Sequence, residues 1–208
     1  MSRLPLLVKV VSIRYNLAMD TLITQQLLER LSSLLRSESR NLLIADGLQP
    51  VQFEALHYLS ICNRYSDTPM SVTEYLGQTK GTVSQTLKVL EKKGLIVKTT
   101  DSNDKRVSHM SVTKEGKELV SRVLPSPLLQ AAIGEQEVVN INSSLSALLR
   151  AVQHANNFKS FGQCDSCCHN IKSDKGDYFC GLTKEALTRI DIKLICREHD
   201  SNPNKFNN

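Results

Sequence analysis

The stretch SVTEYLGQTKGTVSQTLKVLEKKG, residues 71–94, has apolar residues at helical spacing, and its continuation LIVKTTDSNDKRVSHMSV, residues 95–112, does not. Ser71 and the glutamate three residues later have the spacing of a capping box, and Thr79 begins a second helix that stops at Gly94. The buried stripe of that second helix is Val83, Leu87 and Leu90. Two β-like runs, at 95–100 and 106–112, then flank the polar turn DSNDK, which predicts a hairpin.

Further helices are predicted on both sides of this stretch, at about 20–43, 50–64, 113–124 and 135–158. Asp20 or Thr21 would cap the first, and Pro125 and Pro127 would cut the third. The last helix carries an a/d seam at 3-4-3-4 spacing, made of Val138, Ile141, Leu145, Leu148 and Val152. That seam fits either a dimer contact or packing within its own domain.

The basic residues are concentrated in one segment. Residues 79–117 contain nine Lys or Arg and four Asp or Glu, an excess of +5 that equals the net charge of the whole chain. A basic patch confined to one segment is typical of a nucleic-acid binder, although a solvated basic face would have the same composition. A structural motif is therefore needed to decide between these two interpretations of the patch.

Three helices followed by a hairpin, with the basic excess in the last helix and the hairpin, predict a winged helix-turn-helix. The fold class is mainly α with a small β-hairpin wing. The second helix of such a turn lies in the major groove, and a thin ribbon carries arginine into the minor groove. The candidate DNA contacts are Lys80, Thr82, Val83, Ser84, Gln85 and Lys88 on the helix, with Lys105 and Arg106 at the wing tip. A winged helix used as a protein-binding module is the alternative.

Residues 48–117 resemble the MarR family of regulators. The similarity lies in LQPVQFEALHYLS, SVTEYLGQTKGTVSQTLKVLEKKGLI and DKRVSHMSVTKEGKEL. The family pattern of Asp, one residue, Arg, and a strand ending in Leu-Thr-x-x-Gly is matched by Asp104, Arg106 and Val112 to Gly116, with Val in place of Leu. The resemblance implies that Asp104 orients Arg106 toward the minor groove. It also implies a homodimer whose intertwined helices would be about 20–43 and 114–158, although the PSP sequence at 125–127 departs from the pattern.

These patterns divide the chain into four parts. Residues 1–18 form a loose extension, or precede the natural start at Met19. Residues 19–158 form the winged-helix DNA-binding and dimerisation domain, 160–200 a cysteine-rich module, and 201–208 a disordered polar tail. Without a secretory signal we expect a cytoplasmic protein, and no apolar run is long enough to span a bilayer.

Five of the six cysteines lie between Phe161 and Asp200. In a reducing compartment, clustered cysteines indicate metal ligands or redox groups more than disulfides. The spacing predicts one metal centre per chain, with Cys164, Cys167, Cys180 and Cys196 as ligands and Cys168 or His199 as substitutes. Zinc and an iron–sulfur cluster fit this spacing equally well, and metal-free reactive thiols are a third alternative. The remaining cysteine, Cys62, is expected to be a small buried hydrophobe.

No sequence pattern indicates catalysis, because a phosphate-cradling glycine loop and a nucleophile elbow are both missing. We therefore expect a homodimeric, sequence-specific transcriptional regulator, a repressor, that binds a pseudo-palindromic double-stranded operator and responds to the state of its cysteines. The sequence leaves room for a small-molecule effector without naming one. The alternative is a metal-binding redox or interaction module that uses the winged helix as a scaffold.

Overall fold

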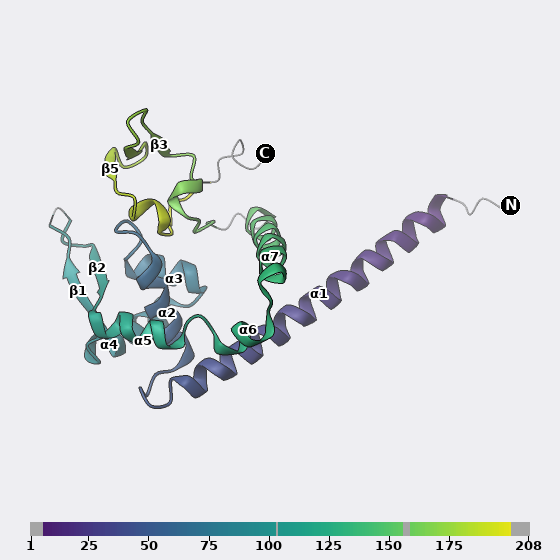
Figure 1. Cartoon of the computed structure of the whole chain (residues 1–208), viewed down its shortest axis with the longest axis horizontal. Helices are drawn as coiled ribbons and strands as arrows, with labels where there is room; N and C mark the ends of the chain where they lie inside the picture. The colour runs from purple at the N-terminus through teal and green to yellow at the C-terminus, as the bar shows by residue number, and fades with distance from the viewer. Residues whose placement is uncertain (1–5, 103, 156–158, 201–208) are drawn as a thin grey trace. The chain divides into compact units, whose positions relative to one another are not determined.

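A computed structural model describes residues 6–102, 104–155 and 159–200. It has two compact units, Met1–Gly47 and Leu48–Asn208 (Figure 1). The predicted tail at 201–208 lies outside the described residues. No helix in the described ranges is long and apolar enough to cross a membrane.

The first unit is one helix, α1, over Leu6–Leu42. The expected start near Asp20 is wrong, and residues 6–18 are helical where we expected a loose extension. Thr21 is an interior residue of the helix, and its hydroxyl donates to the Leu17 carbonyl four residues earlier, at 2.7 Å. The physical reason is that no glycine or proline interrupts residues 6–42, so nothing stops the helix at the polar pair.

The second unit begins with the winged helix, made of α2 (Pro50–Ile61), α3 (Pro69–Leu76) and α4 (Lys80–Lys92), followed by β1 (Ile96–Thr100) and β2 (Ser108–Val112). Figure 1 shows the three helices clustered beside the hairpin, whose antiparallel strands pair Ile96 with Val112 and Thr100 with Ser108. Fully or almost fully buried side chains from all three helices make the core: Phe53, Leu56, Tyr58, Val72, Val83, Leu87 and Leu90. Burying each large apolar side chain contributes about 1.5–3 kcal/mol, so this core is a main source of the domain's stability.

The cap of α3 also differs from the one expected. Thr68, not Ser71, caps α3, and its hydroxyl accepts from the Ser71 N–H at 3.3 Å. Pro69 then occupies the first turn, so the helix is capped three residues earlier (71 − 68) than the capping-box pattern indicated. Thr79 caps α4 as predicted, and Gly94 has the left-handed conformation, with φ of 70°, that ends the helical segment.

The Val-Thr-x-x-Gly sequence fixes the next helix, α5 (Lys114–Val123), against the residues that follow α4. The Thr113 hydroxyl accepts from the Gly116 N–H at 3.1 Å and donates to the Gly94 carbonyl at 2.8 Å. A Cβ added at Gly116 would collide with the Leu95 carbonyl oxygen. Glycine is therefore required at 116 because α5 approaches the backbone that leads into the wing.

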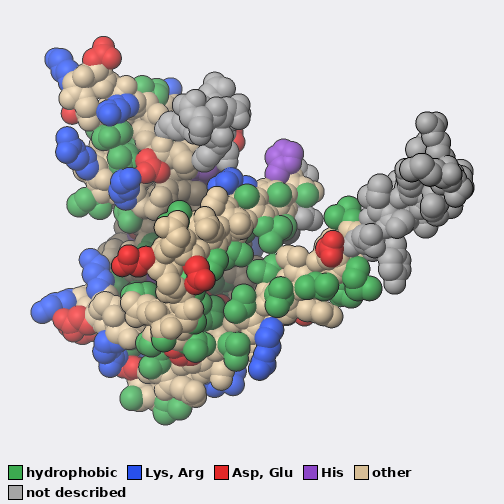
Figure 2. All heavy atoms as spheres, turned by 45° about the vertical axis from the view of Figure 1, so that its right-hand side comes forward, with side chains coloured by type: hydrophobic (Ala, Val, Ile, Leu, Met, Phe, Trp, Pro, Cys, Tyr) green, Lys and Arg blue, Asp and Glu red, His purple; other side chains and the backbone are tan. Residues whose placement is uncertain are grey.

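Two more helices follow the predicted break at the prolines. The short helix α6 (Pro127–Ala132) was not predicted, and α7 covers Glu135–Ala155. All five residues of the a/d seam on α7 are between 37% and 47% exposed, and hydrophobic side chains are among those that reach the surface in Figure 2. Each residue of the seam therefore keeps more than a third of its surface exposed in the part of the chain that the structure describes.

The C-terminal module comprises a 3-10 turn η1 (Cys164–Ser166), the antiparallel strands β3 (Asn170–Lys172), β4 (Tyr178–Cys180) and β5 (Glu185–Leu187), and a second 3-10 turn η2 (Asp191–Lys193). Its hydrophobic cluster among the described residues consists of Cys164, Leu187 and Ile192, with Tyr65 of the winged helix packed against it, and Cys167 is the fourth buried residue. A core of that size is too small to order some forty residues by apolar burial alone.

Candidate nucleic-acid interface and cysteine-rich module

The N-terminal half of α4 presents most of the predicted DNA contacts to solvent. The cap is made by the Thr79 hydroxyl, which accepts from the Thr82 N–H at 3.1 Å. The exposed candidates are Lys80, Thr82, Ser84, Gln85 and Lys88. Val83 is only 2% exposed, so its assignment as a DNA contact is wrong. It faces the core together with Leu87, one turn further on, because residues four apart share one face of a helix.

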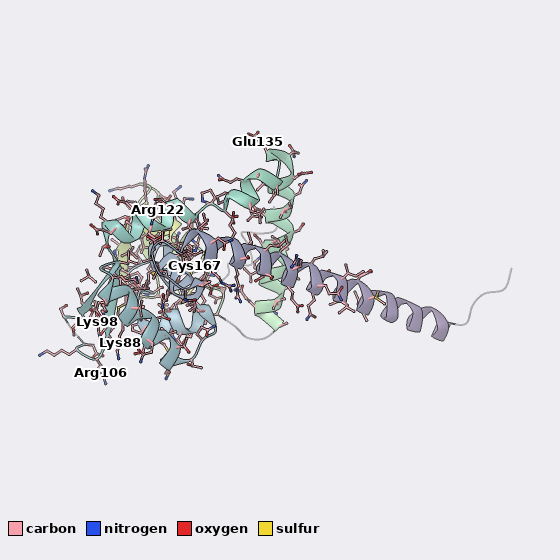
Figure 3. The ribbon with its side chains drawn as sticks, turned by 90° about the horizontal axis from the view of Figure 1, so that it is seen from below. Lys88, Lys98, Arg106, Arg122, Glu135 and Cys167 are labelled. Carbon is pink, nitrogen blue, oxygen red and sulfur yellow. The ribbon has the colours of Figure 1, made fainter. Side chains whose placement is uncertain are left out.

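A hollow of about 240 Å³ opens beside α4. Lys80, Lys88 and Lys98 line it, together with apolar side chains that include Val83 and Met110. Figure 3 shows Lys88 and Lys98 at the same end of the ribbon as Arg106, away from the labelled Arg122. Three of the lysines that give residues 79–117 their positive charge therefore lie around one concave surface next to the wing.

Arg106 projects from the wing and is held by Asp104. The guanidinium donates from Nε to Oδ1 at 2.9 Å and from Nη2 to Oδ2 at 2.8 Å, while 90% of the Arg106 side chain stays exposed. This hydrogen-bonded pair lowers the pKa of Asp104 and raises that of Arg106. A bidentate pair fixes the plane of the guanidinium, so Arg106 is oriented before any ligand arrives.

His109 lies on β2. Its ring lies between two carboxylates, with Nδ1 2.6 Å from Oδ1 of Asp67 and Nε2 3.2 Å from Oδ2 of Asp101. The hydrogen bond to Asp67 is the main cause that raises the pKa of His109, and Asp101 adds to it. No local pattern could have paired His109 with Asp67, since the two residues are 42 positions apart.

The four predicted ligands Cys164, Cys167, Cys180 and Cys196 line one cavity of about 30 Å³. Cys164 and Cys167 are buried, at 6% and 5% exposure, and the other two are half-buried. Burial, followed by the neighbouring thiols of Cys167, Cys196 and Cys180, raises the pKa of Cys164 to about 12. The fold therefore brings together cysteines that are up to 32 positions apart (196 − 164).

The cavity also contains polar atoms without a partner. Among the described residues, two buried side-chain atoms have no hydrogen-bond partner, Asn170 Oδ1 and Thr183 Oγ1, and both residues line this cavity. Unpaired buried polar groups of this kind are usually explained by a bound ion or an ordered water. Four thiols are a ligand set that zinc and iron–sulfur clusters both use.

The two substitute ligands lie elsewhere. Cys168 is exposed, and its sulfur is within 4.8 Å of donor atoms of His169 and Asp200, a spacing that the four cavity thiols do not reach within the described ranges. His199 is occupied at both ring nitrogens, by the hydroxyl of Ser160 at Nδ1 and that of Ser166 at Nε2. Neither residue is directed into the four-cysteine cavity.

The module is joined to the winged helix by backbone and side-chain bonds that sequence reasoning missed. The Asn63 N–H donates to the Ile195 carbonyl at 2.9 Å, and the Ile195 N–H donates to the Ile61 carbonyl at 3.0 Å. The Arg197 guanidinium makes a bidentate pair with Glu74 on α3, at 2.7 and 2.6 Å. The module is therefore docked on the segment that connects α2 and α3 (Figure 1).

A second contact joins Arg64 to the module. Its guanidinium donates to Glu185 at 3.1 Å and to the Ala186 carbonyl at 3.0 Å, and the Tyr65 hydroxyl donates to the same glutamate at 2.6 Å. The ring of Phe161 packs edge-on against Tyr75, with centroids 5.3 Å apart. The junction is thus a mixed polar and aromatic surface rather than one apolar core.

Comparison with known proteins finds relatives of the winged helix. Residues 46–107 match the model of the MarR family. This stretch of the chain is therefore similar to the MarR family. The transcriptional repressor MprA of Escherichia coli strain K12 is 29% identical over 106 residues, which are 51% of this chain and 60% of that repressor. The match thus spans less than two thirds of the curated relative.

Solved structures support the MarR-family fold. The Staphylococcus aureus MepR–DNA complex aligns with a TM-score of 0.51 at 23% identity, over 61% of this chain and 96% of that one. A MarR transcriptional regulator from Methanosarcina mazei Go1 aligns with a TM-score of 0.57 at 18% identity, over 64% of this chain and 98% of that one. The predicted fold, mainly helical with a small antiparallel wing, is confirmed.

Proposed function

We propose that this chain is a sequence-specific, DNA-binding transcriptional repressor that acts as a homodimer. The observation that carries the proposal is the basic surface of α4 and the pre-oriented Arg106 within a stretch similar to the MarR family. The similar E. coli protein MprA is a transcriptional repressor, and one of the similar MepR structures is a complex with DNA. The exposed lysines would contact phosphate, and Ser84 and Gln85 would contact base edges.

The exposed apolar surfaces support the homodimer. The seam on α7 leaves Ile141 and Leu145 39% and 44% exposed, and Leu27 and Leu31 on α1 are 59% and 49% exposed. Rows of exposed large hydrophobic side chains at helical spacing mark surfaces that another helix covers. A two-fold dimer would bind a pseudo-palindromic operator whose half-sites lie about one helical turn apart.

The test is selection of binding sites from a random double-stranded DNA library, followed by fluorescence anisotropy with the selected duplex at fixed salt. We expect a pseudo-palindrome, and Arg106→Ala should weaken binding by about tenfold. Lys175→Ala, which removes one positive charge from an exposed turn of the module, is the matched control and should leave affinity within about twofold. An unenriched library, or equal affinity of the two variants, would refute the proposal.

For the module we propose one structural zinc ion held by the thiolates of Cys164, Cys167, Cys180 and Cys196. Zinc would supply the crosslink that the small hydrophobic cluster does not, in the manner of other small metal-dependent folds. The thiolates would bind the ion, and Thr183 would donate its hydroxyl to one of them.

Elemental analysis and a visible spectrum of anaerobically purified protein test this assignment. We expect a colourless protein with about one zinc per chain. Broad visible absorption with stoichiometric iron and sulfide would overturn zinc in favour of a cluster that senses redox state or iron. The alternative function, in which the module acts and the winged helix is a scaffold, predicts bound metal without any selected DNA sequence.

A further inference from the structure

The segment Cys62–Asp67 contacts both the cysteine-rich module and the wing. On the module side, the Arg197 N–H donates to the Ser66 hydroxyl at 2.8 Å. On the other side, the Asp67 carbonyl accepts from the Met110 N–H of β2 at 2.8 Å. Buried hydrogen bonds hold the segment between these ends, because the Ser66 hydroxyl donates to Asn63 Oδ1 at 2.8 Å and Tyr58 donates to the Ser66 carbonyl at 2.7 Å.

His109 extends this connection into the wing. Its ring joins Asp67, which ends the segment, to Asp101, which follows β1. The other carboxylate oxygen of Asp101 accepts from the Asp104 N–H at 2.7 Å. Asp104 in turn holds the Arg106 guanidinium, so hydrogen bonds run without a gap from the fixed segment to the wing tip.

We propose that His109 is a positioning residue of the DNA-binding wing, where its imidazolium ties Asp67 to Asp101 and so sets how Arg106 is presented to DNA. This inference rests on the proposed DNA-binding function. His109 itself does not contact DNA. It acts on Arg106 at the wing tip through Asp101 and Asp104.

The protonated ring is the form that satisfies both partners. A neutral imidazole has one donor and one acceptor nitrogen, so one of its nitrogens would face a carboxylate oxygen with a lone pair. The titratable groups that face the ring are Asp67, from the segment before α3, and Asp101, after β1. Both favour the cation, and the raised pKa of His109 agrees with this geometry.

The sign of the pH dependence follows. The folded-state pKa of His109 is above its ordinary value of 6.5, so the charged clamp is complete below 6.5 and is lost as pH rises through the raised pKa. DNA affinity should therefore fall as the pH rises from 6.5 through the raised pKa of His109. This fall should be larger than the weak pH dependence expected when an exposed surface charge is lost. His154 is an exposed residue of α7, 45 positions (154 − 109) after His109 in the sequence. Its substitution therefore provides the matched histidine control.

The experiment measures anisotropy of the selected duplex from pH 6 to 8.5 at constant ionic strength, for the wild type, His109→Gln and His154→Gln. We expect the wild type and His154→Gln to lose affinity together as pH rises. His109→Gln should bind about three- to tenfold more weakly at pH 6 and show a flat profile. A His109→Gln profile that matches the wild type would overturn the proposal.

A double-mutant cycle separates positioning from a general loss of structure. In the Arg106→Ala background, His109→Gln should cause little further loss, because both act through the same side chain. An equal fold-loss in both backgrounds would overturn the positioning role, and Asp101→Asn provides a second way to open the clamp if His109→Gln does not fold. If the wild type selects no DNA sequence, the proposed function fails. If Arg106 matters and His109 does not, only this inference fails.

Discussion

The winged helix and the cysteine-rich module are neighbours in one compact unit, and they are stabilised by different means. Leu56, Leu90 and other side chains with no exposure fill the core of the winged helix. The described part of the module has four buried residues, and two of them are among the four cysteines that line a small cavity. The difference indicates that the winged helix folds from its own apolar content, whereas the module depends on ligands and on the surface to which it docks.

The sharpest test of this contrast is removal of one metal ligand. Cys180→Ser should abolish metal binding and unfold the module, because the binding free energy of a structural zinc site is also folding free energy, about 10 kcal/mol or more. Hydrogen exchange should lose protection over 160–200 and keep it over 50–95. Cys168→Ser, outside the cavity, is the control and should keep its metal. Retained metal in Cys180→Ser would exclude the four-cysteine assignment.

A smaller but global effect is expected from the apolar core. Leu90→Ala should lower the free energy of unfolding of the winged helix by about 2–5 kcal/mol, because a fully buried side chain leaves a cavity. Leu187→Ala in the module should leave the main urea transition of the winged helix unchanged. If both substitutions shift one common transition equally, the two regions form a single cooperative unit and the contrast is wrong.

The docking surface should give the smallest effect. Arg197→Ala removes a partly buried bidentate pair with Glu74 and should weaken docking by about 1–2 kcal/mol, measured as faster hydrogen exchange over 160–200 at pH 7. Arg197 lowers the pKa of Glu74, so this contribution is present above the ordinary carboxyl pKa and is lost as pH falls through the lowered value. Lys193→Ala, at an exposed ion pair within the module, is the control. Unchanged exchange in Arg197→Ala would show that the pair between Arg197 and Glu74 contributes nothing to docking.

The features that the sequence predicted correctly are those determined by interactions between residues close together in the chain. Thr79 and Gly94 delimit the recognition helix through caps that act within a few residues, and the period change after Gly94 revealed the hairpin. Val83 was misassigned although its own apolar stripe with Leu87 marked it as buried. The error came from treating the first residues of α4 as one exposed group, whereas a helix turns one residue in every three or four toward the core.

Contacts between distant residues had no such signal. Cysteine is rare and chemically specific, so the grouping of the four cavity residues was predictable from spacing. His109 and Asp67, or Arg197 and Glu74, are ordinary polar residues that meet only after the chain has folded. The substitutes Cys168 and His199 were plausible by spacing alone, and it is the course of the backbone that directs them to other partners.

The join between Ile61, Asn63 and Ile195 has a consequence for how this architecture tolerates change over generations. Its bonds are made by main-chain N–H and carbonyl groups, which every residue except proline supplies in full. A substitution at Ile195 therefore leaves the position of the module on the winged helix unchanged. The strength of the attachment depends instead on the side chains of Arg197 and Glu74. Substitutions at these two positions would change how tightly the module is bound without changing where it is bound.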